Sequence, residues 1–354
     1  MKSPSGGKSR ARITRRLPSR PMAIDFHAHF VLPEAAAFAR PYKVTAANTQ
    51  TPDDPRITKK ARAEAAKKWG DVTRQRMQDF KVRLKVMDRA GIDIQVLSAS
   101  LIVQYTYWAE PESSLRIERK SNDLLAEIIA TAPHRFVGLG GVPLQSPELA
   151  ITEMERCIGD LGFKGIQVSG SAGHMELGDA RLRPFWSRAE QLCAMIYIHP
   201  AGVPEPRYQK HQLWNSLGQP QEEAMAMMSL IYDGIIDDYP KLKICIAHGG
   251  GYLPFYAGRV DRNYLDKPQM RYGQERTPSQ YMKKSFYYDS CGYDRDMFDF
   301  LVKKVGARRI VLGSDYPVGE KDPVRFVTRS RVLSAADKER ILSKNAARLL
   351  GLRL

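Results

Sequence analysis

Two histidines separated by a single residue, His27 and His29, directly follow a short apolar run near the start of the chain. In an extended strand alternate side chains point to the same face, so the two imidazoles would project together. Paired neutral imidazoles are typical ligands of Zn²⁺ and similar ions. The motif is short, and two unrelated surface histidines in a turn would produce the same letters. Its meaning therefore depends on the other polar residues of the chain.

Three further ionisable residues stand directly after apolar runs: His199, His248 and Asp315. Together with the first pair, four of the seven histidines lie at the carboxyl ends of candidate strands. Chance placement would scatter histidines over helices and loops. The carboxyl ends of parallel strands meet on one face, so this pattern predicts a single site that gathers all five side chains.

Short apolar runs alternate with helical patterns from residue 23 onward, and there are eight such runs. Several are apolar throughout, as expected for parallel strands covered on both faces. Eight strand–helix repeats predict an α/β fold of the (β/α)8 type, a TIM barrel. Closure of the barrel would bring Asp315, after the last strand, next to the histidine pair. The predicted strands are Ile24–Phe26, Ile94–Ser98, Phe136–Val142, Gly165–Val168, Met195–His199, Leu242–Ala247, Phe286–Asp289 and Ile310–Gly313.

Helical periodicity fills most of the segments between these runs. A doubly wound open sheet is the alternative fold, but it normally has fewer strands, and the chain contains no GxGxxG motif or P-loop to support it. The predicted helices are Asp79–Ala90, Arg116–Thr131, Pro147–Leu161, Leu182–Leu192, Gln221–Ile236, Asp296–Val305 and Ala335–Leu350.

Residues 1–22 are basic, contain Gly, Ser and Pro, and lack periodicity, so we predict a disordered tail. Residues 23–354 would form the barrel as one domain. An insertion at residues 31–80 separates the first strand from its helix and includes a helical stretch, Lys59–Trp69. Because the insertion follows the carboxyl end of a strand, we expect it to form a lid over the site or part of an oligomer interface.

The net charge of +16 is concentrated in two segments. Residues 1–24 carry seven basic and no acidic side chains, and residues 57–86 carry ten basic and three acidic ones. The rest of the chain, which holds the candidate site, is nearly neutral. A basic tail can bind polyanions, but no recognition motif accompanies it, so binding of nucleic acid is disfavoured relative to a small acidic substrate. No run approaches the roughly 18–20 apolar residues that span a membrane.

The four cysteines lie in apolar or helical patterns and form no CxxC pair. We predict that they are reduced thiols of the core, which indicates a cytoplasmic protein. They are Cys157, Cys193, Cys245 and Cys291.

Several longer blocks resemble the decarboxylase branch of the amidohydrolase superfamily, and together they run from about residue 23 to the C-terminus. The blocks around His248 and within residues 135–163 are the longest. The resemblance is carried by Asp25–His29, Tyr107–Ala109, Arg135–Gly140, Pro147–Ala150, Glu153–Cys157, Leu161–Phe163, His199–Pro200, Tyr239–Lys243, Ala247–Gly251, Gly258–Arg259 and Gly313–Pro317.

The resemblance implies that His27, His29, His199 and Asp315 bind one divalent metal ion, with zinc favoured over manganese. Members of this superfamily with two ions bridge them by a carboxylated lysine or a carboxylate at the end of the fourth strand. Here that strand reads Gly-Ile-Gln-Val-Ser-Gly, and Lys164 precedes it at the opposite end. A single ion is therefore expected.

The resemblance also assigns the catalytic and substrate-binding residues. His248 would contact the metal-bound water and act as general acid and base, with Asp315 beside it. Arg259 would bind a substrate carboxylate across the interface of a homodimer or higher homo-oligomer, since the guanidinium fork matches a carboxylate. Trp108 follows the second strand and would line the substrate pocket, although packing in the core or at an interface is the competing interpretation.

Two departures from the family pattern concern the substrate pocket. Relatives carry Trp after the His-Pro of the fifth strand, whereas this chain has Ala201. The insertion also does not align with theirs, so a second arginine for the substrate can be suggested only by position, as Arg74 or Arg76. These departures leave the substrate open.

We therefore predict a metal-dependent, non-oxidative decarboxylase of a small carboxylated unsaturated or aromatic acid. The alternative is a hydrolase or hydratase of a small cyclic, amide or unsaturated acid that uses the same ligands. The presence of Arg259 favours decarboxylation. Binding of nucleic acid through the basic tail is a third hypothesis, which the complete set of metal ligands makes the weakest.

Overall fold

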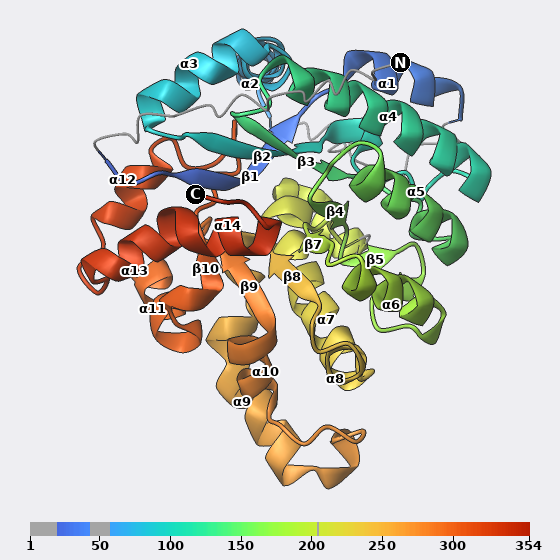
Figure 1. The fold of residues 1–354 in the computed structure, drawn as a ribbon, viewed down its shortest axis with the longest axis vertical. Coiled ribbons are helices and arrows are strands. Elements are labelled where there is room, and N and C mark those ends of the chain that lie inside the picture. Colours follow the sequence, from blue (N-terminus) through green and yellow to red (C-terminus); the bar gives the residue numbers. More distant parts are fainter. Residues whose placement is uncertain (1–19, 43–56, 204) are drawn as a thin grey trace, which may run out of the picture.

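The computed structural model describes residues 20–42, 57–203 and 205–354. Eight strands form one sheet in the order β1-β2-β3-β4-β7-β8-β9-β10, and all neighbouring strands in this order are parallel. The predicted (β/α)8 barrel is thus confirmed (Figure 1). The strands are β1 (Ile24–Phe30), β2 (Ile94–Ala99), β3 (Phe136–Gly140), β4 (Gly165–Val168), β7 (Met195–Ile198), β8 (Lys243–Ile246), β9 (Phe286–Asp289) and β10 (Ile310–Val311).

The barrel is closed by the segment that follows β10, which lies against β1. The Phe26 amide donates to the Leu312 carbonyl at 2.7 Å, and the His29 amide donates to the Tyr316 carbonyl at 3.0 Å. A parallel bridge joins Ala28 to Tyr316. The two chain segments that carry the histidine pair and Asp315 are therefore bonded directly to each other.

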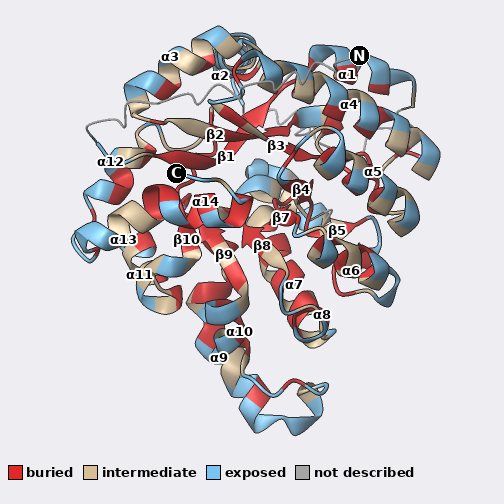
Figure 2. Cartoon of the chain, in the orientation of Figure 1, coloured by how far each residue is buried: buried red, intermediate tan, exposed pale blue. Residues whose placement is uncertain are grey.

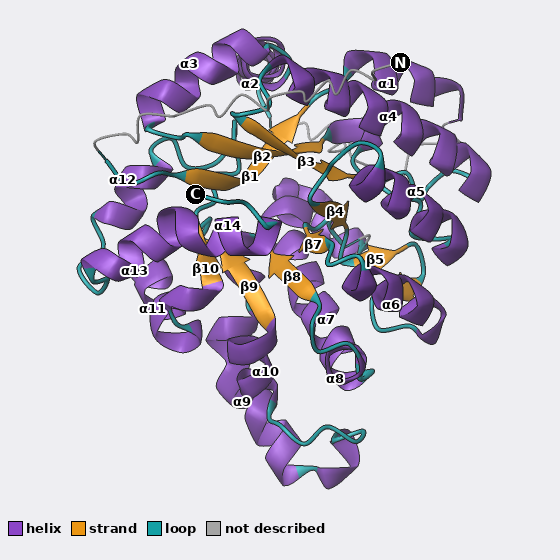
Figure 3. Cartoon of the chain, viewed as in Figure 1, coloured by secondary structure: helices purple, strands orange, loops and turns teal. Residues whose placement is uncertain are grey.

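Helices surround the sheet on its outer face (Figure 3). They are α1 (Pro33–Ala39), α2 (Lys59–Asp71), α3 (Phe80–Ala90), α4 (Pro111–Thr131), α5 (Pro147–Gly159), α6 (Arg183–Gln191), α7 (Gln219–Tyr232), α8 (Ile235–Asp238), α9 (Leu253–Asp266), α10 (Pro278–Ser285), α11 (Arg295–Val305), α12 (Pro323–Thr328), α13 (Ala335–Glu339) and α14 (Asn345–Leu350). Among the helices of the described residues, none is long and apolar enough to cross a membrane.

Two hydrophobic clusters explain why the strands are apolar on both faces, and Figure 2 shows the strands as largely buried. The larger cluster packs the outer face of the sheet against the helices. The smaller one fills the barrel interior, where α14 covers the amino ends of the strands. Its strand residues are Ile24, Phe26, Val96, Leu139, Met195, Tyr197, Cys245, Ala247 and Val311.

A β-bulge interrupts the pairing of β1 with β2. Asp25 pairs with Gln95 and then Ala28 pairs with Leu97, so two residues of β1 face one residue of β2. Strict alternation would put Asp25 on the same face as His27. The extra residue changes the face to which the following side chains point, as bulges next to functional sites commonly do. Asp25 turns outward to accept from the Gln95 amide at 2.8 Å, while the histidine pair points into the site.

The structure differs from the sequence prediction in several elements. Two short strands, β5 (Ser171–Ala172) and β6 (Met175–Glu176), form a separate hairpin, and α9 and α10 were not anticipated. Of the four cysteines, all are free, but Cys193 is exposed at a turn, so the prediction of a core thiol is wrong there. The predicted disordered tail lies mostly outside the described residues, as do positions 43–56 of the insertion. The helix predicted inside the insertion is confirmed as α2.

Candidate metal centre and active site

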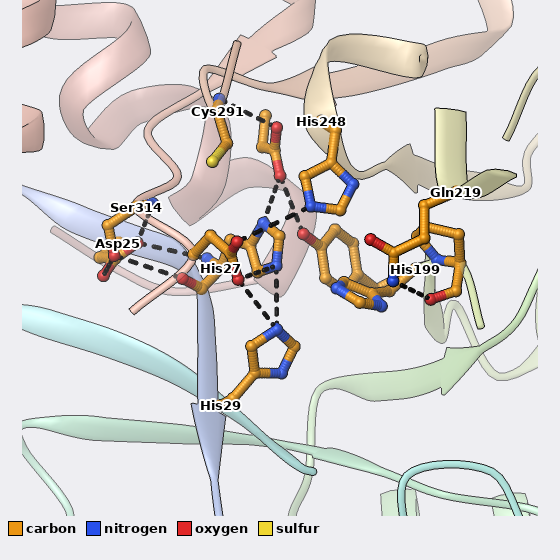
Figure 4. Close-up of polar contacts among 12 residues, drawn as sticks. Asp25, His27, His29, His199, Gln219, His248, Cys291 and Ser314 are labelled. Atoms are coloured by element: carbon orange, nitrogen blue, oxygen red, sulfur yellow. Dashed lines mark hydrogen bonds and ion pairs between the residues drawn. The ribbon is translucent and has the colours of Figure 1, made fainter. Parts of the chain in front are cut away.

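Three side-chain atoms converge where β1 meets the segment after β10. His27 Nε2 lies 3.2 Å from His29 Nε2, and Asp315 Oδ1 lies 3.3 Å and 3.2 Å from these two nitrogens. All three side chains are buried or nearly so. Figure 4 shows the two imidazoles facing each other from the same strand.

This triangle has the dimensions of one face of a metal coordination sphere. Zinc–nitrogen and zinc–oxygen bonds of about 2.0–2.2 Å in tetrahedral geometry separate neighbouring ligand atoms by about 3.3–3.5 Å. His29 Nδ1 is buried and has no hydrogen-bond partner among the described residues, so this ring is held by packing and by its Nε2 contacts. The donor set of two imidazoles and a carboxylate suits zinc and manganese. The residues present therefore fit a divalent ion.

His199 completes the ring of imidazoles from the end of β7. Its ring centroid lies 4.7 Å from that of His29 and 5.0 Å from that of His27. Single ligand atoms of His27, His199, His248 and Asp315 all lie within 4.8 Å of one another. Five side chains thus surround one point, and the structure brings together every residue that the sequence predicted for the metal or the acid–base role.

The surroundings of His29 and His199 favour the neutral imidazole, which is the form that binds a metal. Burial lowers the pKa of His29 and lowers that of His199 well below its ordinary value. The neighbouring imidazoles add to the effect at His199. On its other side, His199 Nδ1 lies 3.1 Å from Gln104 Nε2 and 3.3 Å from the Tyr105 hydroxyl, which hold the ring.

Asp289, at the end of β9, orients His27 by contacting Nδ1, the ring nitrogen outside the ligand triangle. Its Oδ2 lies 2.7 Å from His27 Nδ1 and accepts from the Tyr197 hydroxyl at 2.9 Å, while Oδ1 accepts from the amides of Gly249 and Cys291. This aspartate thus faces the site and also caps the turns that follow β8 and β9. A carboxylate on the far nitrogen of a metal-binding histidine fixes its tautomer and raises its basicity.

The outer oxygen of Asp315 faces two further groups. Oδ2 accepts from the Tyr293 hydroxyl at 2.7 Å and lies 3.9 Å from His248 Nε2. Burial by itself disfavours the carboxylate, but the adjacent His27, His29 and His248 outweigh it and hold the pKa of Asp315 below its ordinary value. His248, Tyr293 and Asp315 all have positive φ angles, of 47°, 55° and 54°. Such conformations persist only where the surrounding structure imposes them.

His248 is paired with a buried glutamate on α7. Its Nδ1 lies 2.6 Å from Glu223 Oε1. Burial lowers the pKa of His248, but the carboxylates of Glu223 and Asp315 outweigh it and raise the pKa to about 9. The turn after His248 makes room for this pair, because a Cβ at Gly251 would lie 2.2 Å from the Pro220 carbonyl and 2.9 Å from Glu223 Oε2.

Residues predicted to contact substrate are placed differently. Trp108 is half-buried and packs against the outer core, in agreement with the competing interpretation, so its substrate contact stays a prediction. Arg259 is exposed on α9 and makes no ion pair within the described part of the chain. Arg74 and Arg76 are also exposed, and Ala201 lies exposed just after His199 and Pro200. Within the described ranges, none of these three arginines makes a hydrogen bond or ion pair with a histidine of the site.

Strand β4 contains no lysine or carboxylate, and its polar side chain is the amide of Gln167. Gln167 pairs with Tyr197, which reaches the floor of the site, so the two side chains share a face. Lys164 is exposed and precedes β4, as expected from the sequence.

Sequence reasoning missed Gln104, Glu223 and Tyr293. Glu223 carried no distinctive signal, because acidic residues are favoured near the amino end of a helix and are ordinarily exposed there. Tyr293 and Gln104 lie in loops, where no periodicity marks which side chains turn inward.

Comparison with known proteins agrees with this geometry. A family model described as an amidohydrolase matches residues 24–352. A 2-amino-3-carboxymuconate-6-semialdehyde decarboxylase of Dictyostelium discoideum is 36% identical over 77% of this chain and 77% of its own length. A gamma-resorcylate decarboxylase of Rhizobium sp. strain MTP-10005 is 31% identical over 80% of this chain and 90% of its own.

A solved structure extends the similarity to the fold. The dihydroxybenzoic acid decarboxylase of Polaromonas sp. JS666, with bound manganese and the inhibitor 2-nitroresorcinol, superposes with a TM-score of 0.78 at 28% identity. The match covers 94% of this chain and 97% of the other.

Proposed function

This chain belongs to the amidohydrolase family and is a carboxy-lyase of that superfamily, and from this premise we propose that it removes CO2 from a small aromatic or unsaturated acid with one divalent ion. We infer that zinc is the resident ion and manganese the alternative. The observation that carries the proposal is the triangle of His27 Nε2, His29 Nε2 and Asp315 Oδ1, with edges of 3.2–3.3 Å.

His27, His29, His199 and Asp315 would hold the ion, and Asp289 and Tyr105 would hold two of the imidazoles in place. A bound divalent ion supplies Lewis-acid chemistry, polarising the oxygen atoms that it binds. The absence of a carboxylate on β4, where Gln167 stands, supports a single ion.

His248 would donate the proton that replaces CO2. Its Nδ1 contacts Glu223 Oε1, which leaves Nε2 as the nitrogen that can serve as the acid. This Nε2 lies 3.9 Å from Asp315 Oδ2. In the proposed reaction a proton from Nε2 bonds to the substrate carbon that bears the carboxylate. The carbon–carbon bond then breaks, its electron pair returns to the substrate, and CO2 leaves. Glu223 keeps the ring oriented throughout, as a positioned partner does for an acid–base histidine.

Arg259 would bind a substrate carboxylate in the site of a partner subunit, which makes the working enzyme a homodimer or higher homo-oligomer. Its exposure on α9, which with α10 projects away from the barrel in Figure 1, supports this role. The four free cysteines support a reducing compartment such as the cytoplasm.

The proposal is tested by elemental analysis together with a substrate panel. Protein purified without added metal is expected to carry one equivalent of zinc or manganese per chain. Carboxylated muconates and dihydroxybenzoates should release CO2, and chelation should abolish this release. Two equivalents of metal would contradict the single-ion site, and a product that retains every carbon of the substrate would favour the hydratase or hydrolase alternative.

A further inference from the structure

Arg83, on α3, is fully buried on the outer face of the barrel, directly behind the metal centre. Its Nη1 donates to Gln95 Oε1 at 2.7 Å, and its Nη2 donates to the main-chain carbonyl of His29. A buried guanidinium is costly unless it is well bonded. This one is bonded to β2 and to the residue of β1 that carries a candidate ligand.

From Gln95 the contacts continue to the segment that carries Asp315. The Gln95 amide donates to Asp25 Oδ2 at 2.8 Å, and this aspartate also accepts from the Ser314 amide at 2.9 Å and hydroxyl at 2.6 Å. Asp25 further accepts from the His27 amide at 3.3 Å. Figure 4 shows Asp25 and Ser314 side by side, to the left of His27.

The aromatic residues that follow two ligands lie against the same guanidinium. Phe30 comes directly after His29 and Tyr316 directly after Asp315, and their ring centroids lie 5.0 Å and 4.5 Å from the Arg83 guanidinium carbon. Such cation–π contacts are stronger when they are shielded from water. Arg83 thus contacts both segments that must come together to form the ligand triangle.

We propose that Arg83, acting through Gln95, Asp25 and Ser314, is a positioning residue that holds the β1 bulge and the segment after β10 in the register required for metal binding. The inference rests on the proposed metal site and deepens it. Arginine suits the task, because its planar fork bonds two acceptors at fixed angles and its faces stack on rings, whereas lysine offers a single point charge.

The same residue connects the insertion to the metal centre. Arg83 Nη2 also lies 3.3 Å from the carbonyl of Arg76, and the Val31 amide donates to the carbonyl of Met77 at 3.0 Å. The last turn of the insertion is therefore joined to the end of β1 in two ways, directly at Val31 and through Arg83 at His29. Residues 72–77 are part of the support of the metal site, whatever the rest of the insertion does.

The test compares Arg83→Lys with Arg89→Lys, a change at an exposed position of the same helix. Affinity for Mn²⁺ is measured on metal-free protein by electron paramagnetic resonance, and affinity for Zn²⁺ by competition with a chromogenic chelator. Loss of an outer partner of metal ligands typically weakens metal binding by about 10–100-fold. We expect such a loss for Arg83→Lys, none for Arg89→Lys, and recovery of turnover by Arg83→Lys at saturating metal.

Folded Arg83→Lys protein that binds both ions with wild-type affinity would overturn the inference. If that variant does not fold, Ser314→Ala provides the decisive measurement, because it removes one hydroxyl bond to Asp25 and leaves the amide bond in place. It should weaken metal binding by several-fold, and wild-type affinity would refute the positioning role. Failure of the wild-type protein itself to bind either ion would instead refute the proposed function.

Discussion

The proposed metal side of the site and its proposed substrate side are built in different ways. On the metal side, His27, His29 and Asp315 project from strand ends and are buried, and Asp289 and Tyr293 bond to His27 and Asp315 respectively. On the substrate side, Arg259 and Ala201 are exposed, and Trp108 packs against the core rather than against the histidines.

This difference separates chemistry from specificity. Ligands on strand ends inherit the rigidity of the barrel, whereas loops and outer helices can change without disturbing it. We therefore expect substitutions on the metal side to remove the ion and the activity together. Substitutions on the substrate side should alter KM or substrate preference while the ion stays bound.

The largest effect is expected for His27→Ala. It removes one corner of the ligand triangle and leaves the buried Asp289 without its imidazole partner. Metal content should fall below one equivalent. Loss of a residue that only supports a ligand costs up to about 100-fold, so loss of the ligand itself should lower kcat by more than about 100-fold. His134→Ala, at an exposed position, is the control. Full metal content with wild-type kcat would mean that the triangle is not the metal centre.

Glu223→Gln should reduce kcat by about 10–100-fold, a part of what general acid–base catalysis contributes. The amide has the same shape as the carboxylate but removes the negative charge that His248 faces at 2.6 Å. Metal content should be unchanged, which distinguishes this residue from the ligands. Steady-state kinetics and elemental analysis check both points, with exposed Glu127→Gln as the control. Loss of metal from Glu223→Gln would show that the glutamate supports the ion instead.

On the substrate side, Arg259→Ala should raise KM and lower kcat/KM by about 10-fold, the cost of one or more hydrogen bonds to a charged group. Arg262→Ala, exposed on the same helix, should have little effect. If Arg259 acts in a partner's site, mixing this variant with His248→Ala should give more activity than the sum of the two proteins measured separately. A fully active wild-type monomer would refute the shared site.

The smallest effect is on stability and concerns the loop between β2 and α4. Buried Glu118 accepts from the Thr106 hydroxyl of that loop at 2.6 Å, and burial raises its pKa to about 8. Between the ordinary pKa of 4.5 and about 8 the folded state holds a proton that the unfolded state has lost. The free energy of unfolding should therefore fall as pH rises through this window, by up to about 1.4 kcal/mol per pH unit.

Urea denaturation from pH 5 to pH 9 measures this slope. Glu118→Gln cannot titrate and should flatten it, whereas exposed Glu112→Gln on the same helix should not. An equal slope in all three proteins would show that Glu118 is ionised in the fold.

Prediction from sequence succeeded where one local rule decided the outcome. Apolar runs of strand length located the eight strands, and the polar residues at their ends located His199, His248 and Asp315. It did not address the direction of Asp25, which depends on a bulge that strict alternation does not reveal. It also missed Tyr293, which depends on a loop with positive φ.

By itself the sequence determined the order of elements, the apolar faces of the strands and the ligand types at their ends, because each of these follows from neighbours a few residues apart. Only the tertiary structure decided which polar groups meet across the barrel. Glu223 reaches His248 over 25 residues, Asp289 reaches His27 over 262, and Asp25 reaches Ser314 over 289. Such contacts depend on closure of the sheet and on helix docking, which bring together groups that no local pattern relates.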